Sequence, residues 1–437
     1  MSQHVTPEEM EKVLGGSLPT GRIKEVVRHL LRGCKTCREG ARQSLLLEAR
    51  GKAVAPAAYD AALESAFDFA RRVEGLPPGE RPRFQKALSL LSRGHDVFDL
   101  TWEGDMPLSG LGIFEALLSR SWAVRYKSPA QMCHLARVAT EMARSFDPQI
   151  HGGPQVADLQ ARAWGELANA YRVADKLQEA KNAFGWAFSL LESGTGDSFL
   201  KARLLDLQSS WWGTRRHFEM ALRTLEIVPA LYREAGDDHL AGRTLITKAL
   251  YTFYSGDATE AIFLNKQGRA LIDEEREPTL VSFAVYNDIL YMIEKESFDQ
   301  AERLLFRNRA RFQSFDAVNS VKLRWVEGRI NYGLKRFPSA EIAFRDVITG
   351  FDVHGMKFAR ALASLELAMT LLRQSRYDEA RAEVLVAHQV FAALEIHREV
   401  LAATIVLKEA FRLRTASLEL LEGTVRYLRK KQIELGL

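Results

Sequence analysis

The chain has 437 residues, of which 47% are hydrophobic and 27% are charged, a balance typical of folded globular proteins that excludes wholesale disorder. Its 60 Lys and Arg residues nearly balance 56 Asp and Glu residues, so the net charge of +4 does not indicate nucleic acid as a direct partner. A chain of this length is too long for one compact core, so we expect several domains or an extended array. Its few prolines and its stretches rich in Ala, Leu, Glu and Arg favour helices.

The sequence favours a cytoplasmic location without a membrane anchor. It contains no run of about 18 apolar residues that could form a transmembrane helix. The opening stretch "MSQHVTPEEMEK" is polar and lacks the apolar segment of a signal peptide. Three cysteines in so long a chain do not form a disulfide framework, which points to a reducing compartment.

The first fifty residues predict three helices. "TPEE" (6–9) has the capping threonine, early proline and glutamate of a helix start, and this helix should run to about residue 15. "GRIKEVVRHLLRG" (21–33) repeats apolar residues at helical spacing and ends in a glycine. A third helix should begin near residue 34. A unit of this size has a marginal core and gains from a metal or another cross-link.

A candidate metal site lies within this unit. Cys34 and Cys37 are three residues apart, so both sulfurs can reach one ion, and His29 lies on the last turn of the preceding helix. A closed tetrahedral zinc site needs a fourth ligand, and His4 is the candidate. Two buried thiols, a site that has lost its metal, and a redox pair are the alternatives, although the redox motif lacks its usual strand-to-helix context.

The stretches "HVTPEEMEKVLGG" and "VVRHLLRGCKTC" resemble the zinc-binding anti-sigma domain of bacteria over about 40 residues. The resemblance implies structural zinc on His4, His29, Cys34 and Cys37, and an RNA-polymerase sigma factor as partner. Four residues separate His29 from Cys34, where the family has three. Many family members carry a membrane span after this domain, and this sequence has none, which argues against envelope signalling.

A linker of two amphipathic helices should follow the N-terminal module. "APAAYDAALESAFDFARRVEGL" (55–76) either completes a sigma-binding surface or caps the first repeat, and "ERPRFQKALSLLSRG" (80–94) is the second helix. We therefore divide the chain into a zinc-binding module at 1–52, a helical linker at 53–108 and a repeat array at 109–437.

The array is indicated by regular spacing. Short junctions such as "DKLQEA", "GDATEA" and "SRYDEA" recur along it, and each ends in an alanine. These alanines are Ala180, Ala221, Ala261, Ala301, Ala340 and Ala380. Their separations of 41, 40, 40, 39 and 40 residues predict a repeat of about 40 residues.

One unit, "AWGELANAYRVADKLQEAKNAFGWAF", resembles the tetratricopeptide repeat. The residues that carry this resemblance are Trp164, Leu167, Ala168, Tyr171, Ala180, Phe184 and Ala187. It implies an all-α fold in which antiparallel helix pairs stack into a right-handed α-solenoid. HEAT-type repeats share the period, but their turn chemistry is absent. The last helices should cap the array.

Stacked helix pairs bind partners in a groove lined by the first helix of each pair. The residues expected to face this groove are Arg162, Asn169, Arg172, Arg203, Arg243, Lys322 and Arg329. So many cations would favour an acidic peptide or an acidic protein surface. The alternative is that some of them are merely solvated surface charges.

No motif for phosphate binding, nucleophilic catalysis or metal-dependent hydrolysis occurs, so we do not expect an enzyme. The sequence predicts a cytoplasmic regulator, in which an anti-sigma-like zinc module is fused to a protein-binding solenoid. The alternative is a plain tetratricopeptide-repeat adaptor, with the N-terminal module as a structural cap.

Overall fold

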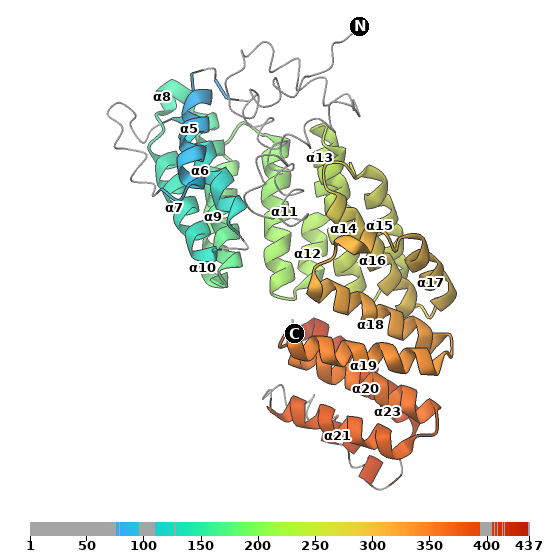
Figure 1. Cartoon of the computed structure of the whole chain (residues 1–437). Helices are drawn as coiled ribbons and strands as arrows, with labels where there is room; N and C mark the ends of the chain where they lie inside the picture. The colour runs from blue at the N-terminus through green and yellow to red at the C-terminus, as the bar shows by residue number, and fades with distance from the viewer. Residues whose placement is uncertain are drawn as a thin grey trace. The chain divides into compact units, whose positions relative to one another are not determined.

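The computed structural model describes residues 76–77, 79–95, 110–125, 128–393 and, except for 406, 409, 413 and 415, 404–435. The predicted zinc module, with His4, His29, Cys34 and Cys37, lies outside these ranges, as does most of the linker. Within the described ranges every regular element is a helix and no strand occurs (Figure 1). None of the described helices combines the length and the hydropathy needed to cross a membrane.

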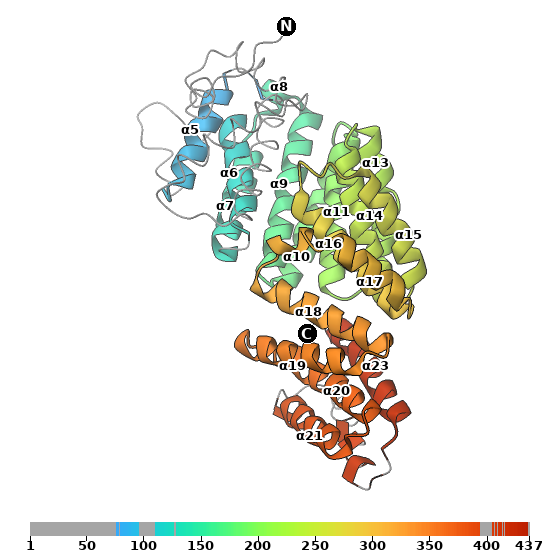
Figure 2. The ribbon, with the colours of Figure 1, turned by 45° about the vertical axis from the view of Figure 1, so that its right-hand side comes forward.

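The helices follow one another as antiparallel pairs (Figure 2). The first elements are α5 (Arg81–Ser92), α6 (Leu111–Ala123), α7 (Pro129–Arg144) and the single turn α8 (Pro148–His151). The next units are α9 (Gly153–Val173) with α10 (Leu177–Leu191), and α11 (Ser198–Thr214) with α12 (Phe218–Leu225) and α13 (Val228–Glu234). They are followed by α14 (Asp238–Tyr254) with α15 (Ala258–Leu271), and by α16 (Pro278–Glu294) with α17 (Phe298–Arg307) and the 3-10 turn η3 (Arg311–Ser314). Then come α18 (Ala317–Gly333) with α19 (Phe337–Val353), and α20 (Lys357–Arg373) with α21 (Tyr377–Ala393). The last is α23 (Leu418–Leu435).

The same turn closes the first helix of every unit from α9 to α20. Its central residue has a positive φ, and these residues are Asp175, Arg216, Gly256, Glu296, Lys335 and Ser375. The N–H group of the next residue donates to a carbonyl five residues earlier, as Lys176 does to Tyr171 at 2.8 Å. This is the Schellman motif, which satisfies carbonyls left open at a helix end. The turns are 41, 40, 40, 39 and 40 residues apart, which confirms the predicted period.

Small residues bring the paired helices together, as the sequence pattern predicts. All six junction alanines are completely buried. Gly328 on α18 shows how close the helices are, because a methyl group there would lie 2.8 Å from the Phe344 ring on α19. The repeat therefore rests on close helix packing, which larger side chains at these positions would disturb.

Aspartates fix the start of several helices. Asp197, Asp237, Asp257 and Asp316 precede α11, α14, α15 and α18, and each side chain accepts a hydrogen bond from a backbone N–H two or three residues further on. Such caps satisfy donors that the helix itself leaves unpaired. With the Schellman turns, they set the limits of the first helices and so the register of the residues that these helices present.

Burial is uneven along the array. In α20, 13 of 17 residues are buried, whereas only four of the 17 residues of α18 are. A helix that is buried on all sides needs neighbours on all sides, and α20 has α19, α21 and α23 packed against it. The final helix α23 therefore packs on α20, a helix of an earlier unit, and covers it. At the other end, α5 from the predicted linker packs on α6 and shares its core.

Candidate protein-binding face

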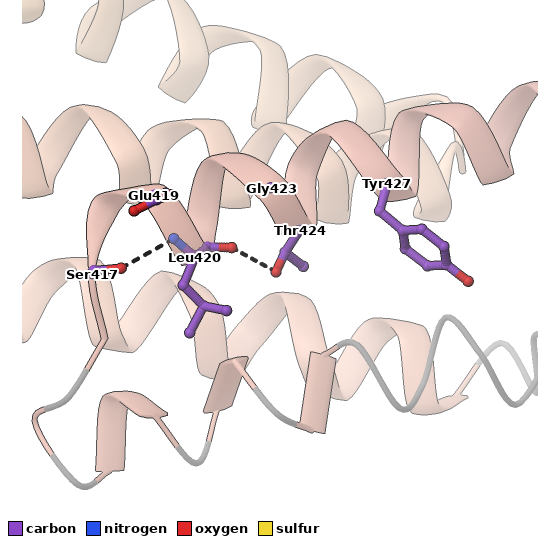
Figure 3. A pocket seen from close by; sticks show the side chains of 6 residues that line it. All are labelled: Ser417, Glu419, Leu420, Gly423, Thr424 and Tyr427. Atoms are coloured by element: carbon purple, nitrogen blue, oxygen red, sulfur yellow. Dashed lines mark hydrogen bonds between the residues drawn. The ribbon is translucent and has the colours of Figure 1, made fainter.

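An open pocket lies on α23 but lacks convergent chemistry (Figure 3). The described residues that line it are Ser417, Glu419, Leu420, Gly423, Thr424 and Tyr427. The Ser417 hydroxyl accepts from the Leu420 N–H at 3.1 Å, and Thr424 donates to the Leu420 carbonyl at 2.8 Å. These bonds cap and stabilise the helix itself, so the candidate functional site is the surface that the first helices present.

The predicted groove residues occupy corresponding positions in successive first helices. Counted back from the positive-φ turn residue, Arg162, Arg203, Arg243 and Lys322 each lie 13 residues earlier. Asn169 and Arg329 lie six residues before their turns, and Arg172 lies three before. The predicted residues therefore share repeat positions on α9, α11, α14 and α18.

Two of these arginines are already paired with carboxylates of the preceding first helix. Arg162 on α9 donates to both carboxylate oxygens of Glu115 on α6, at 2.5 and 2.8 Å. Arg203 on α11 donates through Nε to Glu166 on α9 at 3.0 Å. Burial alone would lower the pKa of Arg203, but the neighbouring acidic groups, with Glu166 foremost, raise it. Both arginines stay charged, and both link consecutive units.

Asp206 on α11 has no such partner. Its carboxylate makes no hydrogen bond and no ion pair within the described part of the chain, although Arg203 and Arg243 are close enough to affect it. Burial raises the pKa of Asp206, and the two arginines offset only part of that rise. Asp206 is half-buried, so its carboxylate can accept a hydrogen bond from water or from a bound group.

Two buried polar atoms nearby are also unpartnered. Asn169 is 1% exposed, and its Oδ1 accepts from Arg172 at 2.9 and 3.1 Å, but its Nδ2 has no acceptor. The hydroxyl of the fully buried Tyr232 on α13 lacks a partner too. Burial raises the pKa of Tyr232, and the charge of Asp206 adds to that rise. Unpartnered buried groups are uncommon in native proteins, and each needs an explanation.

We name this surface the polar face. Its residues are Glu115, Arg162, Glu166, Asn169, Arg172, Arg203, Asp206 and Arg243. Four cations stand against three carboxylates, and Arg243 has a further partner in Glu277, 3.3 Å away. The polar face is therefore close to neutral, although the sequence draws attention to its arginines alone.

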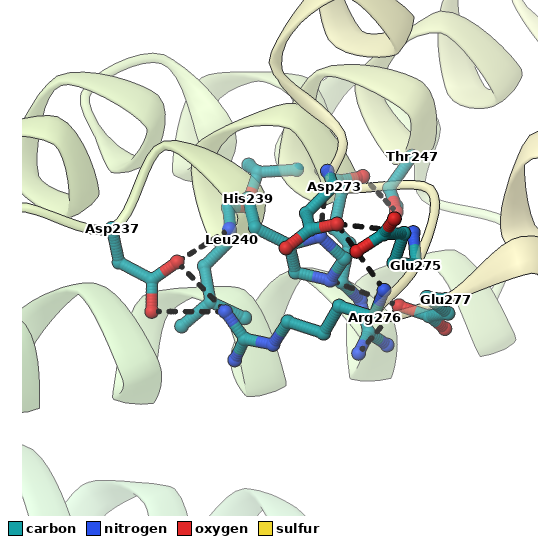
Figure 4. A network of polar contacts seen from close by, with 10 residues as sticks. Asp237, His239, Leu240, Thr247, Asp273, Glu275, Arg276 and Glu277 are labelled. Carbon is teal, nitrogen blue, oxygen red and sulfur yellow. Dashed lines mark hydrogen bonds and ion pairs between the residues drawn. The ribbon is translucent and has the colours of Figure 1, made fainter. Parts of the chain in front are cut away.

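A polar network holds the partner of Arg243 in place (Figure 4). The backbone N–H of Asp273 donates to Nδ1 of the buried His239 at 3.2 Å, so the imidazole hydrogen lies on Nε2, 3.2 Å from a Glu277 oxygen. Burial would raise the pKa of Glu277, but His239 and Arg243 lower it. The network thus keeps Glu277 ionised beside Arg243.

The other predicted arginine of the set, Arg329, lies under α23. Its Nε donates to Glu366 on α20 at 3.0 Å, Trp325 donates to the same carboxylate, and Arg429 on α23 donates to it at 3.0 Å. Burial would raise the pKa of Glu366, but the charges of Arg329 and Arg429 lower it. Burial and the charge of Arg429 lower the pKa of Arg329 to about 10.

A second contact ties α23 to the same helices. Glu422 accepts from the Tyr332 hydroxyl at 2.8 Å and from Arg373 at 3.2 Å. We name this surface the covered face, and its residues are Arg329, Tyr332, Glu366 and Arg373. Lys322, the remaining predicted groove residue, lies on α18 half-buried, and its ammonium makes no hydrogen bond or ion pair within the described ranges.

The structure adds carboxylates that sequence reasoning missed. Glu166 and Glu366 both lie nine residues before their turns, so the same position of the repeat carries an acid on α9 and on α20. That register was readable from the sequence. The metal prediction has no counterpart here, since the described residues contain no group of three or more possible metal ligands and the four predicted ligands lie outside them.

No protein-family model matches this sequence, and no curated protein is similar to it. Among solved structures, a Rap protein complexed with competence and sporulation factor matches with a TM-score of 0.53 at 12% identity, over 73% of this chain and 88% of that one. The apo form of RapI matches with a TM-score of 0.55 at 11% identity, over 74% and 88%.

A signal-transduction ATPase with a tetratricopeptide-repeat sensor from Pyrococcus horikoshii has a TM-score of 0.55 at 13% identity. That match covers 92% of this chain but only 54% of the ATPase. At such identities the likeness concerns the fold alone. The chain therefore has a tetratricopeptide-like helical-repeat fold.

Proposed function

We propose that this protein is a protein-binding adaptor that holds a polypeptide segment of a partner on the polar face. One observation carries the proposal: the half-buried carboxylate of Asp206 has no hydrogen-bond donor within the described residues and lies near Arg203 and Arg243, on a surface where arginines of three successive first helices are held in ion pairs. A peptide backbone offers N–H donors for Asp206 and carbonyl acceptors for arginine N–H groups. Since no motif nominates a nucleophile, we propose binding and not catalysis.

Affinity purification with mass spectrometry would test this proposal. We expect partners of the wild-type chain to be lost or strongly reduced with the Asn169→Ala, Asp206→Ala double variant. Lys181→Ala, an exposed change on α10, is the matched control and should retain them. Equal recovery of every partner by both variants would exclude the polar face.

The sequence predicts an acidic partner, but the net positive charge of the polar face is smaller than its arginines alone would give. An acidic segment would compete with Glu115 and Glu166 for Arg162 and Arg203. The two possibilities differ in salt dependence, because affinity for a strongly acidic partner falls steeply as salt screens its charges. Measuring the affinity of an identified partner at low and high salt separates an acidic segment from one held through its backbone.

We also propose, from the sequence alone, that residues 1–52 bind one structural zinc through His4, His29, Cys34 and Cys37 and engage an RNA-polymerase sigma factor in the cytoplasm. Purified protein should contain about one zinc per chain, because closed structural sites bind one ion. Cys34→Ser with Cys37→Ser should remove it, and unchanged zinc content would refute the site.

A sigma factor should co-purify with the full chain and be lost when residues 1–52 are deleted. If those residues only cap the array, the deleted chain should keep its partners through the polar face. Failure of every sigma factor of the source organism to co-purify would remove the anti-sigma proposal and leave the adaptor role intact.

A further inference from the structure

The covered face differs in chemistry from the polar face at the same positions of the repeat. Where α9 and α11 carry Arg162 and Arg203, 13 residues before the turn, α20 carries the completely buried Leu362. Where α9 carries Asn169, α20 carries Met369, which is 7% exposed. This stretch of α20 is therefore suited to contact with an apolar surface, and α23 packs on it.

The side of α23 that packs on α20 has the pattern of a helix bound in a groove. Leu421, Val425 and Leu428 follow the spacing of one helical face and are at most 1% exposed. The opposite side is exposed, and the residues there include Glu419, Gly423, Arg426 and Lys430. Peptide helices that dock into hydrophobic grooves are recognised by anchors with this spacing.

Two charged residues beside the apolar anchors fix the direction of the helix. Glu422 meets Tyr332 and Arg373, while Arg429, seven residues later and so on the same side, meets Glu366. The acid directly follows the first anchor, Leu421, and the base directly follows the last, Leu428. Reversing the helix would place Arg429 toward Arg373 and Glu422 toward Glu366, which like charges disfavour.

The receiving groups also have partners outside α23. Glu366 keeps its bonds from Arg329 and Trp325, and Arg373 lies 3.5 Å from the Tyr332 hydroxyl. The links contributed by α23 are partly exposed, since the side chains of Glu422 and Arg429 are 31% and 30% exposed. The groups that receive α23 are therefore preorganised, and the contacts that Glu422 and Arg429 of α23 make with them are accessible to solvent.

We propose that the covered face is a second protein-binding surface, specific for an amphipathic helix with an acid and, seven residues later, a base beside apolar anchors, and that α23 is its exchangeable internal occupant. A partner helix of this pattern binds by displacing α23. This surface is separate from the polar face and takes a helix, so the proposal does not depend on the function proposed above.

A labelled peptide of residues 417–433 tests this with the full-length chain, by fluorescence anisotropy. Glu422→Ala with Arg429→Ala should loosen α23, while Glu419→Ala with Arg426→Ala changes only its exposed side and is the matched control. Because apparent affinity scales with the fraction of chains whose site is free, we expect the first variant to bind the peptide about tenfold or more tighter than the control. Adding Glu366→Gln should remove the gain.

Equal peptide affinity of the two double variants, at equal helix content, would overturn the proposal. Native-state hydrogen exchange of the wild-type chain provides a second measurement that does not depend on any variant folding. Exchangeable docking requires α23 amides to exchange faster than α20 amides, and equal protection would show that α23 is a permanent part of the array. Asn169→Ala with Asp206→Ala should leave peptide binding unchanged, which separates this proposal from the function of the polar face.

Discussion

The polar face and the covered face are built on the same repeat but differ in the side chains that they carry at its corresponding positions. Both lie on first helices that end in the same Schellman turn, at the same spacing from it. On α9 and α11 the positions carry charges in partly exposed pairs, whereas on α20 they carry Leu362, Met369 and a buried carboxylate. The helix pair fixes where a side chain points, and the identity of that side chain decides whether the surface is open or needs a cover.

The two faces also differ in what their carboxylates contribute to stability. Glu366 is 2% exposed and accepts from two arginines and a tryptophan, so its charge is compensated. Asp206 is near arginines but bonds to none of them. Because burial raises the pKa of Asp206, we expect its ionised form to oppose folding.

The largest effect should follow removal of the central acid of the covered face. Glu366→Ala leaves Arg329 and Arg429 facing each other without their counter-charge, and breaking such a buried network costs about 3–5 kcal/mol. We expect that loss in the free energy of unfolding, measured by urea denaturation. Glu141→Ala, which removes an exposed pair with Arg144, should cost less than about 0.5 kcal/mol. Similar losses in both variants would mean that the covered face is not a cooperative network.

The pH dependence of stability should differ in sign between the faces. The folded state lowers the pKa of Glu366, so its contribution is present above the ordinary glutamate value of 4.5 and is lost as the pH falls through the folded-state value. The folded state raises the pKa of Asp206, so ionisation of Asp206 opposes folding as the pH rises.

Substitution of each acid by its amide separates these contributions. At pH 7, Asp206→Asn should raise the free energy of unfolding and Glu366→Gln should lower it, and both differences from wild type should shrink as the medium becomes acidic enough to protonate the carboxylates. Urea titrations at several pH values measure this. A stabilising Glu366→Gln at pH 7 would contradict the contrast between the faces.

How much of this could be read from the sequence depends on the range of the contacts. The period was predictable because small residues such as Ala180 and Ala340 must recur where helices touch. The arginines and Asn169 of the polar face were predicted through the same register, but its carboxylates were not. Their partners were not, because Arg203 and Glu166 belong to different repeats and the pairing depends on rotamers.

The position of α23 was even harder to predict from the sequence, because Arg429 and Glu366, which meet in the structure, are 63 residues apart. The only hint was the apolar character of α20 on all sides, in "FARALASLELAMTLL". A pattern within one helix reveals that the helix is covered, but it does not identify the covering segment. The sequence predicts that the last helices cap the array, and the structure shows α23 packed on α20.

The smallest effect should be equal in the two regions, because it concerns the turn that they share. Asp175 and Ser375 adopt φ values of 58° and 61°, which cost side-chain-bearing residues roughly 1–2 kcal/mol, and neither side chain makes a hydrogen bond or ion pair within the described ranges. Asp175→Gly near the polar face and Ser375→Gly near the covered face should each stabilise the chain by about 0.5–1 kcal/mol, after the larger entropy of glycine in the unfolded chain is subtracted.

Gly256 provides the reverse control, since its φ of 100° and open surroundings leave strain as the main cost of Gly256→Ala, which should destabilise by about 1 kcal/mol. Thermal or urea unfolding measures all three variants. A gain at Asp175 with none at Ser375 would mean that the turns themselves differ along the array, so that the contrast between the faces would begin in the backbone. Equal gains would mean that the contrast between the faces arises only from the side chains of the first helices and from the helix that covers them.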